Sequence, residues 1–260
     1  MGFYDLSKAE REQKYLDVQN DIYENLVSET TNDIDKYFSD SDTYIRKAGY
    51  LAIGKLYKNN DFIRCKIIKV LEQLMQDEDE KVRQTVINSC GEIAIMDFES
   101  VARIFEIGLL DNHHSVKNAV QGSLKKSGEK NHMPIISFCQ KHIQNDNPEV
   151  RRQIAHGLEL RGRTHPEDIM LVLKLLQFDN HKRVRPMVVH IFGQISYKKD
   201  CLPKVVKELL TWDDEKLVND CLNEIIKQHE HINNHFKTVE TLSPEECRRY
   251  INEAKIKSVM

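Results

Sequence analysis

The sequence predicts an all-α fold in which antiparallel helix pairs stack in series as a solenoid. A turn motif recurs along the chain at a constant interval. The separation between Asp77 and Asp111 is one such repeat interval. Each copy is followed by apolar residues at the spacing of one helix face. The 260 residues include only 10 Gly and 6 Pro, a composition that favours helices over sheet.

The repeat is defined by a turn rich in Asp and Asn and by a Val that follows it at a fixed distance. The turn positions are Asp77, Asp111, Asn145, Asp179 and Asp213. The matching apolar positions are Val82, Val116, Val150, Val184 and Val218, and an earlier copy supplies Ile45, which precedes Val82 by slightly more than this repeat interval. An Asp or Asn side chain can cap a helix by accepting its free N–H groups, so each turn predicts the start of a helix.

Each repeat is predicted to hold two helices. Val150, Ile154 and Leu158 follow one turn at helical spacing and form the apolar stripe of a second helix. The first helix lies upstream, where another apolar position recurs at the same repeat interval, at Ile67, Val101, Ile135 and Ile169. One pair cannot bury both stripes alone, so successive pairs must stack on a continuous core.

The repeat register divides the chain into three parts. We expect a capping helix in residues 1–29, where Ser7 and Glu10 have the spacing of a capping box. Six helix pairs fill residues 30–231 as a solenoid. Residues 232–260 are expected to form a polar joint and a last helix that begins near Pro244.

Several function classes lack their signals in the sequence. No apolar run reaches the roughly 18 residues of a membrane span, and the polar start lacks the apolar core of a signal peptide, so we expect a cytoplasmic protein without membrane contact. The six Cys have no C-x-x-C pair, and no glycine-rich phosphate loop is present. His229, His231 and His235 lack the H-E-x-x-H spacing of a zinc site. We therefore expect no metal and no small-molecule cofactor.

Charge is unevenly distributed along the chain. Residues 1–114 hold 14 Lys and Arg against 22 Asp and Glu, residues 115–210 hold 17 against 9, and residues 211–260 hold 7 against 10. The net charges are therefore −8, +8 and −3. The basic middle segment indicates either a surface that binds a polyanion or charge complementarity inside the protein, and composition does not choose between them.

The densest group of basic residues is the stretch NPEVRRQIAHGLELRGR, residues 147–163. We interpret it as one helix whose apolar stripe faces the core. On a helical wheel, the opposite face carries Arg152, His156, Glu159 and Arg163. The alternative interpretation is a solvated face, because charged residues on the outside of a helix usually contact only water.

The motif D-x-x-x-x-V-R resembles the HEAT repeat over about four-fifths of the chain. The resemblance implies a right-handed superhelix whose second helices line a concave surface. It also implies a ladder in which turn aspartates pair with the basic residue after each repeated apolar position, at Arg46, Arg83, Lys117, Arg151 and Arg185. On the concave surface, the candidates for nucleic-acid contact are Arg152, Arg163, His156, His190, Lys125 and Tyr197.

Residues 145–212 are also similar to part of the HEAT-like DNA alkylation-repair glycosylases. The similarity rests on V-R-R at 150–152, on Q-I-S-Y-K at 194–198 and on Trp212. It implies a DNA-facing surface and excision of alkylated purines, for which Glu159 is the candidate catalytic carboxylate. The characteristic Trp and Asp cluster of that family is absent, so the resemblance favours DNA binding over catalysis.

Three functions follow as hypotheses. The first is a non-enzymatic binding module whose basic concave face, in repeats three to five, binds a polyanion, with DNA as the favoured partner. The second is an alkylpurine DNA glycosylase that uses Glu159. The third is a scaffold that holds a protein partner, a role that repeat proteins commonly serve.

Overall fold

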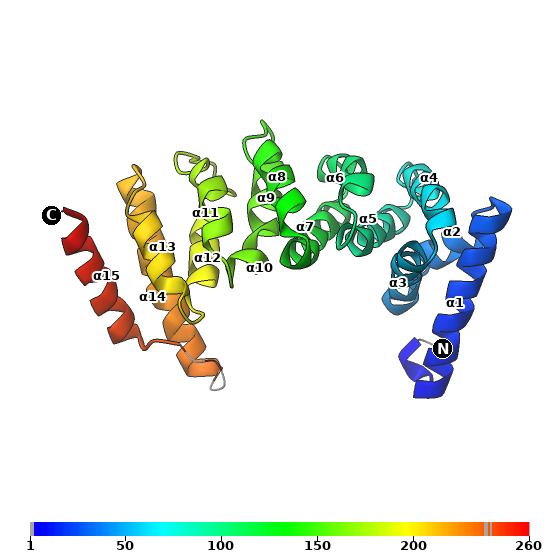
Figure 1. Cartoon of the computed structure of the whole chain (residues 1–260), viewed down its shortest axis with the longest axis horizontal. Helices are drawn as coiled ribbons and strands as arrows, with labels where there is room; N and C mark the ends of the chain where they lie inside the picture. Colours follow the sequence, from blue (N-terminus) through cyan, green and yellow to red (C-terminus); the bar gives the residue numbers. More distant parts are fainter. Residues whose placement is uncertain (1–2, 237–238, 240, 260) are drawn as a thin grey trace. The chain divides into compact units, whose positions relative to one another are not determined.

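The computed structural model describes residues 3–236, 239 and 241–259. Regular structure in these residues is entirely helical, without a β-strand, and Figure 1 shows the succession of short helices. The predicted all-α fold of stacked helix pairs is confirmed. No helix in the described ranges combines the length and the apolar character needed to cross a membrane.

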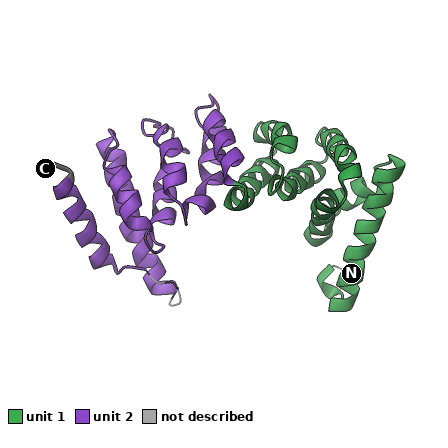
Figure 2. Ribbon diagram, in the orientation of Figure 1, with its two compact units in different colours: residues 1–131 green, residues 132–260 purple. Residues whose placement is uncertain are grey.

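The chain forms two compact units, residues 1–131 and residues 132–260, which Figure 2 shows in green and purple. Unit 1 contains η1 (Phe3–Asp5), α1 (Lys8–Ser28), α2 (Asn32–Ser39), α3 (Thr43–Asn59), η2 (Asp61–Ile63), α4 (Arg64–Leu74), α5 (Glu80–Ala94), η3 (Glu99–Val101), α6 (Ala102–Leu109) and α7 (His114–Lys130). Unit 2 contains α8 (His132–His142), α9 (Pro148–Gly157), α10 (Glu159–Gly162), α11 (Glu167–Lys174), α12 (Arg185–Ser196), α13 (Cys201–Leu209), α14 (Glu215–His235) and α15 (Pro244–Val259).

Successive pairs within each unit pack mainly through their second helices. In unit 1, α3 packs on α5, and α5 packs on α7. In unit 2, α9 packs on α12, and α12 packs on α14, while α11 contacts both α8 and α13 in the row of first helices. The pairs run from α2 with α3 to α13 with α14, which gives six pairs in the described residues, as the repeat register predicts.

The repeated apolar positions form the core of each unit. Four of the second-helix positions, Val82, Val116, Val150 and Val184, are at most 1% exposed. The same limit holds for the first-helix positions Ile67, Val101, Ile135 and Ile169. Full burial of one such side chain stabilises the fold by about 1.5–3 kcal/mol, so the repeated stripes are the main source of stability.

Arginines that follow the repeated valines tie consecutive turns together. In unit 1, Arg83 Nη1 donates to the backbone oxygens of Asp77 and Glu78 in its own turn, at 2.8 and 2.9 Å. Its Nε donates at 2.7 Å to the carboxylate of Asp111 in the next repeat. The hydrogen bonds to Asp111 outweigh the opposing effect of burial and raise the pKa of the Arg83 guanidinium, which therefore stays charged.

The same contact recurs twice in unit 2. Arg151 Nε donates to Asp179 at 2.6 Å, and Arg185 Nη1 donates to Asp214 at 2.8 Å. The partner of Arg185 is thus Asp214, which also caps α14, and not the neighbouring Asp213 of the repeat register. The hydrogen bond from Arg185 lowers the pKa of Asp214 to about 2.

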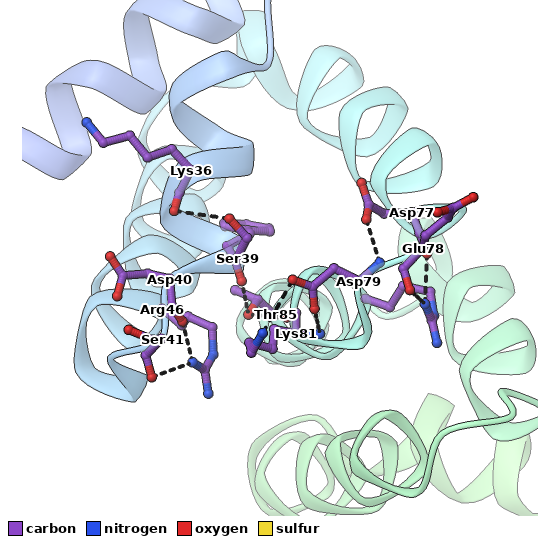
Figure 3. Close-up of polar contacts among 12 residues, drawn as sticks. Lys36, Ser39, Asp40, Ser41, Arg46, Asp77, Glu78, Asp79, Lys81 and Thr85 are labelled. Atoms are coloured by element: carbon purple, nitrogen blue, oxygen red, sulfur yellow. Dashed lines mark hydrogen bonds and ion pairs between the residues drawn. The ribbon is translucent and has the colours of Figure 1, made fainter.

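Two positions of the expected ladder depart from this geometry. Arg46 donates to the backbone of Asp40 and Ser41 in its own turn, as Figure 3 shows, and it forms no ion pair with the described residues. The next turn aspartate, Asp77, lies farther along the chain from Arg46 than the paired aspartates lie from their arginines. Lys117 also forms no ion pair among the described residues, and the side chain at the matching place in the next turn is an uncharged Asn.

The two ends of the chain show the expected caps. Ser7 and Glu10 form a capping box at the start of α1, in which the Ser7 N–H donates to the Glu10 carboxylate at 2.7 Å. At the other end, α15 begins at Pro244. Residues 232–235 of the expected polar joint are helical, because α14 continues to His235, and positions 237, 238 and 240 lie outside the described residues.

The ladder pair between Arg151 and Asp179 is expected to stabilise unit 2. Arg151→Ala should lower the free energy of unfolding by about 1–3 kcal/mol, because it leaves the Asp179 carboxylate, 11% exposed, without its charged partner. Urea unfolding followed by circular dichroism measures the change. Lys117→Ala is the matched control and should cost less than about 0.5 kcal/mol. Equal losses in the two variants would contradict a stabilising role for the pair.

Candidate interaction surface

The residues expected at a nucleic-acid interface are divided between the two units. Arg152 and His156 lie on α9, Arg163 follows α10, and His190 lies on α12, all in unit 2. Tyr197 caps the C-terminus of α12, and it is partly exposed. Lys125 lies on α7 of unit 1. The candidate surface described below therefore belongs to unit 2.

Residues 147–163 do not form the single helix that the sequence indicated. The helix breaks at Leu158, whose N–H donates to Ala155 three residues back, and this tighter turn separates α9 from α10. Gly157 precedes the break, and glycine destabilises a helix interior by about 1 kcal/mol relative to alanine. A 3-10 step advances the chain by about 120° where an α-helical step advances it by about 100°, so the helical wheel fails beyond the break.

Glu159 is the residue that this break displaces most from its expected position. The wheel placed it on the outer face, but its side chain is only 3% exposed. Arg163 Nη2 donates to Glu159 Oε1 at 2.5 Å and to Gln194 Oε1 at 2.8 Å. His156 Nε2 lies 2.9 Å from Glu159 Oε2, and His190 Nε2 lies 3.8 Å from the same oxygen. Burial of a carboxylate requires such partners, because an unpaired buried charge is strongly unfavourable.

Arg152 belongs to a second cluster, centred on Glu149. Arg152 Nη2 donates to the Glu149 carboxylate at 2.7 Å, Gln153 donates at 3.0 Å, and Arg183 donates at 3.2 Å. The Arg152 hydrogen bonds outweigh the effect of burial and lower the pKa of Glu149 to about 2. The side chain of Arg152 is only 21% exposed. Arg152 and Arg163 are therefore each paired with a carboxylate of their own unit. This pairing is the charge complementarity inside the protein that was one of the two interpretations of the basic segment.

The surface of unit 2 carries a groove of about 650 Å³ between α12 and α14. Its lining residues are Asn180, Lys182, Arg185, Pro186, Val189, His190, Lys216, Asp220, Asn223, Glu224 and Lys227. Most of its lining residues are polar or charged, and they include both signs of charge. We call it the lysine groove, after the three exposed lysines Lys182, Lys216 and Lys227.

Of the expected nucleic-acid contacts, only His190 lines this groove, and Arg185 of the expected ladder lines it as well. The residues from α14 were missed. The missed residues occupy repeat-equivalent positions, since Lys216, Asp220 and Glu224 follow Lys182, Pro186 and His190 by one repeat interval. Extension of the register by one repeat would have found them. The expected surface was defined by net charge and not by repeat position. It therefore ended with the basic segment, residues 115–210, and did not extend to α14.

His229 is a buried histidine in the C-terminal part of α14. Its Nδ1 lies 2.9 Å from Thr241 Oγ1 and 3.2 Å from the Leu242 carbonyl oxygen, so it joins α14 to the segment before α15. Burial lowers the pKa of the His229 imidazole below its usual value. The neutral form is therefore the one that the folded unit accommodates.

A family model described as non-SMC mitotic condensation complex subunit 1 (Cnd1) matches residues 22–158, which is just over half of the chain. No curated protein sequence matches the chain.

Matches to solved structures have low sequence identity. The match to a structure of Kap95p with RanGDP covers 82% of this chain and 31% of the matched chain, at 14% identity and a TM-score of 0.48. A Kap95:Nup1 complex matches 92% of this chain and 35% of its own, at 15% identity and a TM-score of 0.45. An engineered protein matches 85% of this chain and 60% of its own, at 17% identity and a TM-score of 0.36. This chain thus spans about a third of the two matched Kap95 chains.

Acidification below neutral pH is expected to destabilise unit 2 through His229. The unfolded chain takes up a proton at this imidazole as the pH falls through about 6.5, whereas the buried imidazole resists protonation. The unfolded state then binds more protons, so the free energy of unfolding should fall between pH 7 and pH 5.5. Urea unfolding across this range measures the slope. His229→Gln should flatten it, and His165→Gln, at an exposed position, should leave it unchanged; the reverse pattern would refute the assignment.

Proposed function

The chain belongs to the family of non-SMC mitotic condensation complex subunit 1, and we propose that it acts as a non-enzymatic protein-interaction module of a multi-subunit complex. Its helix pairs are HEAT repeats, and repeat scaffolds of this kind present extended surfaces to their partners. The proposed docking surface is the lysine groove between α12 and α14. Its ligand would be an acidic, polar segment of a partner protein.

The observation that supports this proposal is the distribution of exposed and paired charged side chains around the groove. The ammonium groups of Lys182, Lys216 and Lys227 are exposed and form no ion pair with the described residues. By contrast, Arg152, Arg163 and Arg185 are committed to internal carboxylates. An anionic ligand can therefore gain attraction from the lysines without breaking a contact that holds the fold together.

The other groove residues favour a polypeptide over a nucleic acid. Asn180 and Asn223 offer amide groups that can pair with both the N–H and the C=O of a peptide backbone. Asp220 and Glu224 would repel a continuous phosphate backbone, but they can pair with a basic side chain of a peptide. A segment with mostly acidic and some basic residues fits this pattern of charge.

Binding of DNA is the second candidate function, and the +8 net charge of residues 115–210 favours it. Lys198 and Lys199 are exposed just beyond α12, and the Arg183 side chain is 64% exposed despite its contact with Glu149. Phosphates could contact these exposed residues, whereas the expected Arg152 and Arg163 are paired with carboxylates. We do not propose glycosylase activity, because the Glu159 carboxylate is buried and paired.

Charge reversal in the groove tests the proposal. Labelled ten-residue peptides, one rich in Glu with two Lys and one with the charges inverted, are titrated against the full chain by fluorescence anisotropy. The Glu-rich peptide should bind, and Lys216→Glu/Lys227→Glu should weaken its binding by about tenfold or more, equivalent to at least ~1.4 kcal/mol. Lys198→Glu/Lys199→Glu is the matched control and should change the affinity by less than about threefold.

A labelled duplex, titrated at two salt concentrations, distinguishes the two candidates. Duplex binding that falls steeply with salt and is lost in the Lys198→Glu/Lys199→Glu variant, without binding of the Glu-rich peptide, would favour DNA. Absence of peptide binding, or equal binding of both peptides, would overturn the protein-docking proposal.

A further inference from the structure

The geometry of unit 2 points to a transition-metal site that the sequence did not indicate, and we propose that His156, Glu159 and His190 bind one Zn²⁺ ion. The three side chains come from α9, α10 and α12, which pack together in unit 2. One ligand atom from each residue can be chosen so that all three lie within 4.8 Å of one another. Two imidazole nitrogens with one carboxylate oxygen form a ligand set typical of zinc sites that keep a water in the fourth position.

Two of the separations between ligand atoms are close to those around a tetrahedral zinc ion. Two ligand atoms at the usual ~2.0–2.2 Å from such an ion lie roughly 3.4 Å apart. The separations from Glu159 Oε2 bracket this value, at 2.9 Å for His156 Nε2 and 3.8 Å for His190 Nε2. Each therefore needs to change by about half an ångström. The His190 side chain is 46% exposed.

The surroundings orient the carboxylate for this role. Arg163 holds Glu159 Oε1 and also contacts Gln194, so the carboxylate is fixed by one oxygen and presents the other, Oε2, to both histidines. Outer contacts of this kind orient metal ligands and are needed for tight binding. The second ring nitrogen of His156, Nδ1, is buried without a hydrogen-bond partner, so Glu159 supplies the polar contact that positions this ring.

A simpler explanation of the cluster is a buried carboxylate that is neutralised by Arg163 and His156 alone. The spatial arrangement of His190 argues for more than this. His156 and His190 are equivalent positions in successive repeats, and their rings meet edge to face at 5.9 Å above a single carboxylate oxygen. Neutralisation of Glu159 requires one cation, whereas a metal ion uses both histidines.

Zinc titration of the full chain tests the site. After treatment with a chelator and its removal, ZnCl₂ is titrated at pH 7.5 by isothermal titration calorimetry, and the melting temperature is measured with and without zinc. We expect one equivalent to bind and to raise the melting temperature. His156→Ala and His190→Ala should each weaken this binding by roughly tenfold or more, since loss even of outer contacts costs about 10–100-fold.

The control variant is His231→Ala/His235→Ala, which removes a second histidine pair whose rings stack at 4.5 Å on α14. This variant should keep the one-to-one binding. Because His190 is half exposed, His190→Ala is expected to fold normally, and its melting temperature without zinc verifies this. Absence of binding at roughly 100 micromolar zinc would overturn the proposal. Binding that survives both single variants, or that is lost only in the control, would overturn it as well.

Discussion

The whole structure depends on one constraint, which is that a single helix pair of this chain cannot bury the two apolar stripes it carries. Each stripe needs a neighbouring pair, so the pairs must stack, and the stacking must repeat with the same geometry. Neighbouring pairs meet this requirement, since they bury Val82, Val116, Val150 and Val184 almost completely. The constant interval between these valines is the sequence counterpart of that packing.

Stacking also decides which polar contacts can form between repeats. When two pairs pack in the common register, the arginine after the repeated valine of one repeat reaches the turn aspartate of the next, as at Arg83 and Asp111. In the first repeat, a longer interval moves the aspartate out of that register, and Arg46 satisfies its hydrogen bonds within its own turn. The ladder thus follows from the core packing and does not create it.

Three arginines and three lysines of unit 2 have different roles. The planar guanidinium groups of Arg151, Arg152 and Arg163 donate to carboxylates inside the unit. The exposed ammonium groups of Lys182, Lys216 and Lys227 line the groove between α12 and α14. This division agrees with the chemistry of the two groups, since the arginine fork suits fixed, partly buried pairs and the lysine ammonium suits hydrated surfaces. The density of arginines in residues 147–163 therefore reflects internal neutralisation of Glu149 and Glu159, and the groove lies between the second helices of the next two pairs.

The sequence by itself determined the fold class, the helix register, the core positions, the cap at Ser7 and the start of a helix at Pro244, because helical periodicity and turn chemistry are local properties. It determined only part of the candidate site. The break at Leu158 interrupts the apolar stripe's helix, and no periodic pattern records it. The tertiary structure alone decided that Glu159 turns inward between His156, Arg163 and His190, because burial and ion pairing depend on side chains brought together from three helices.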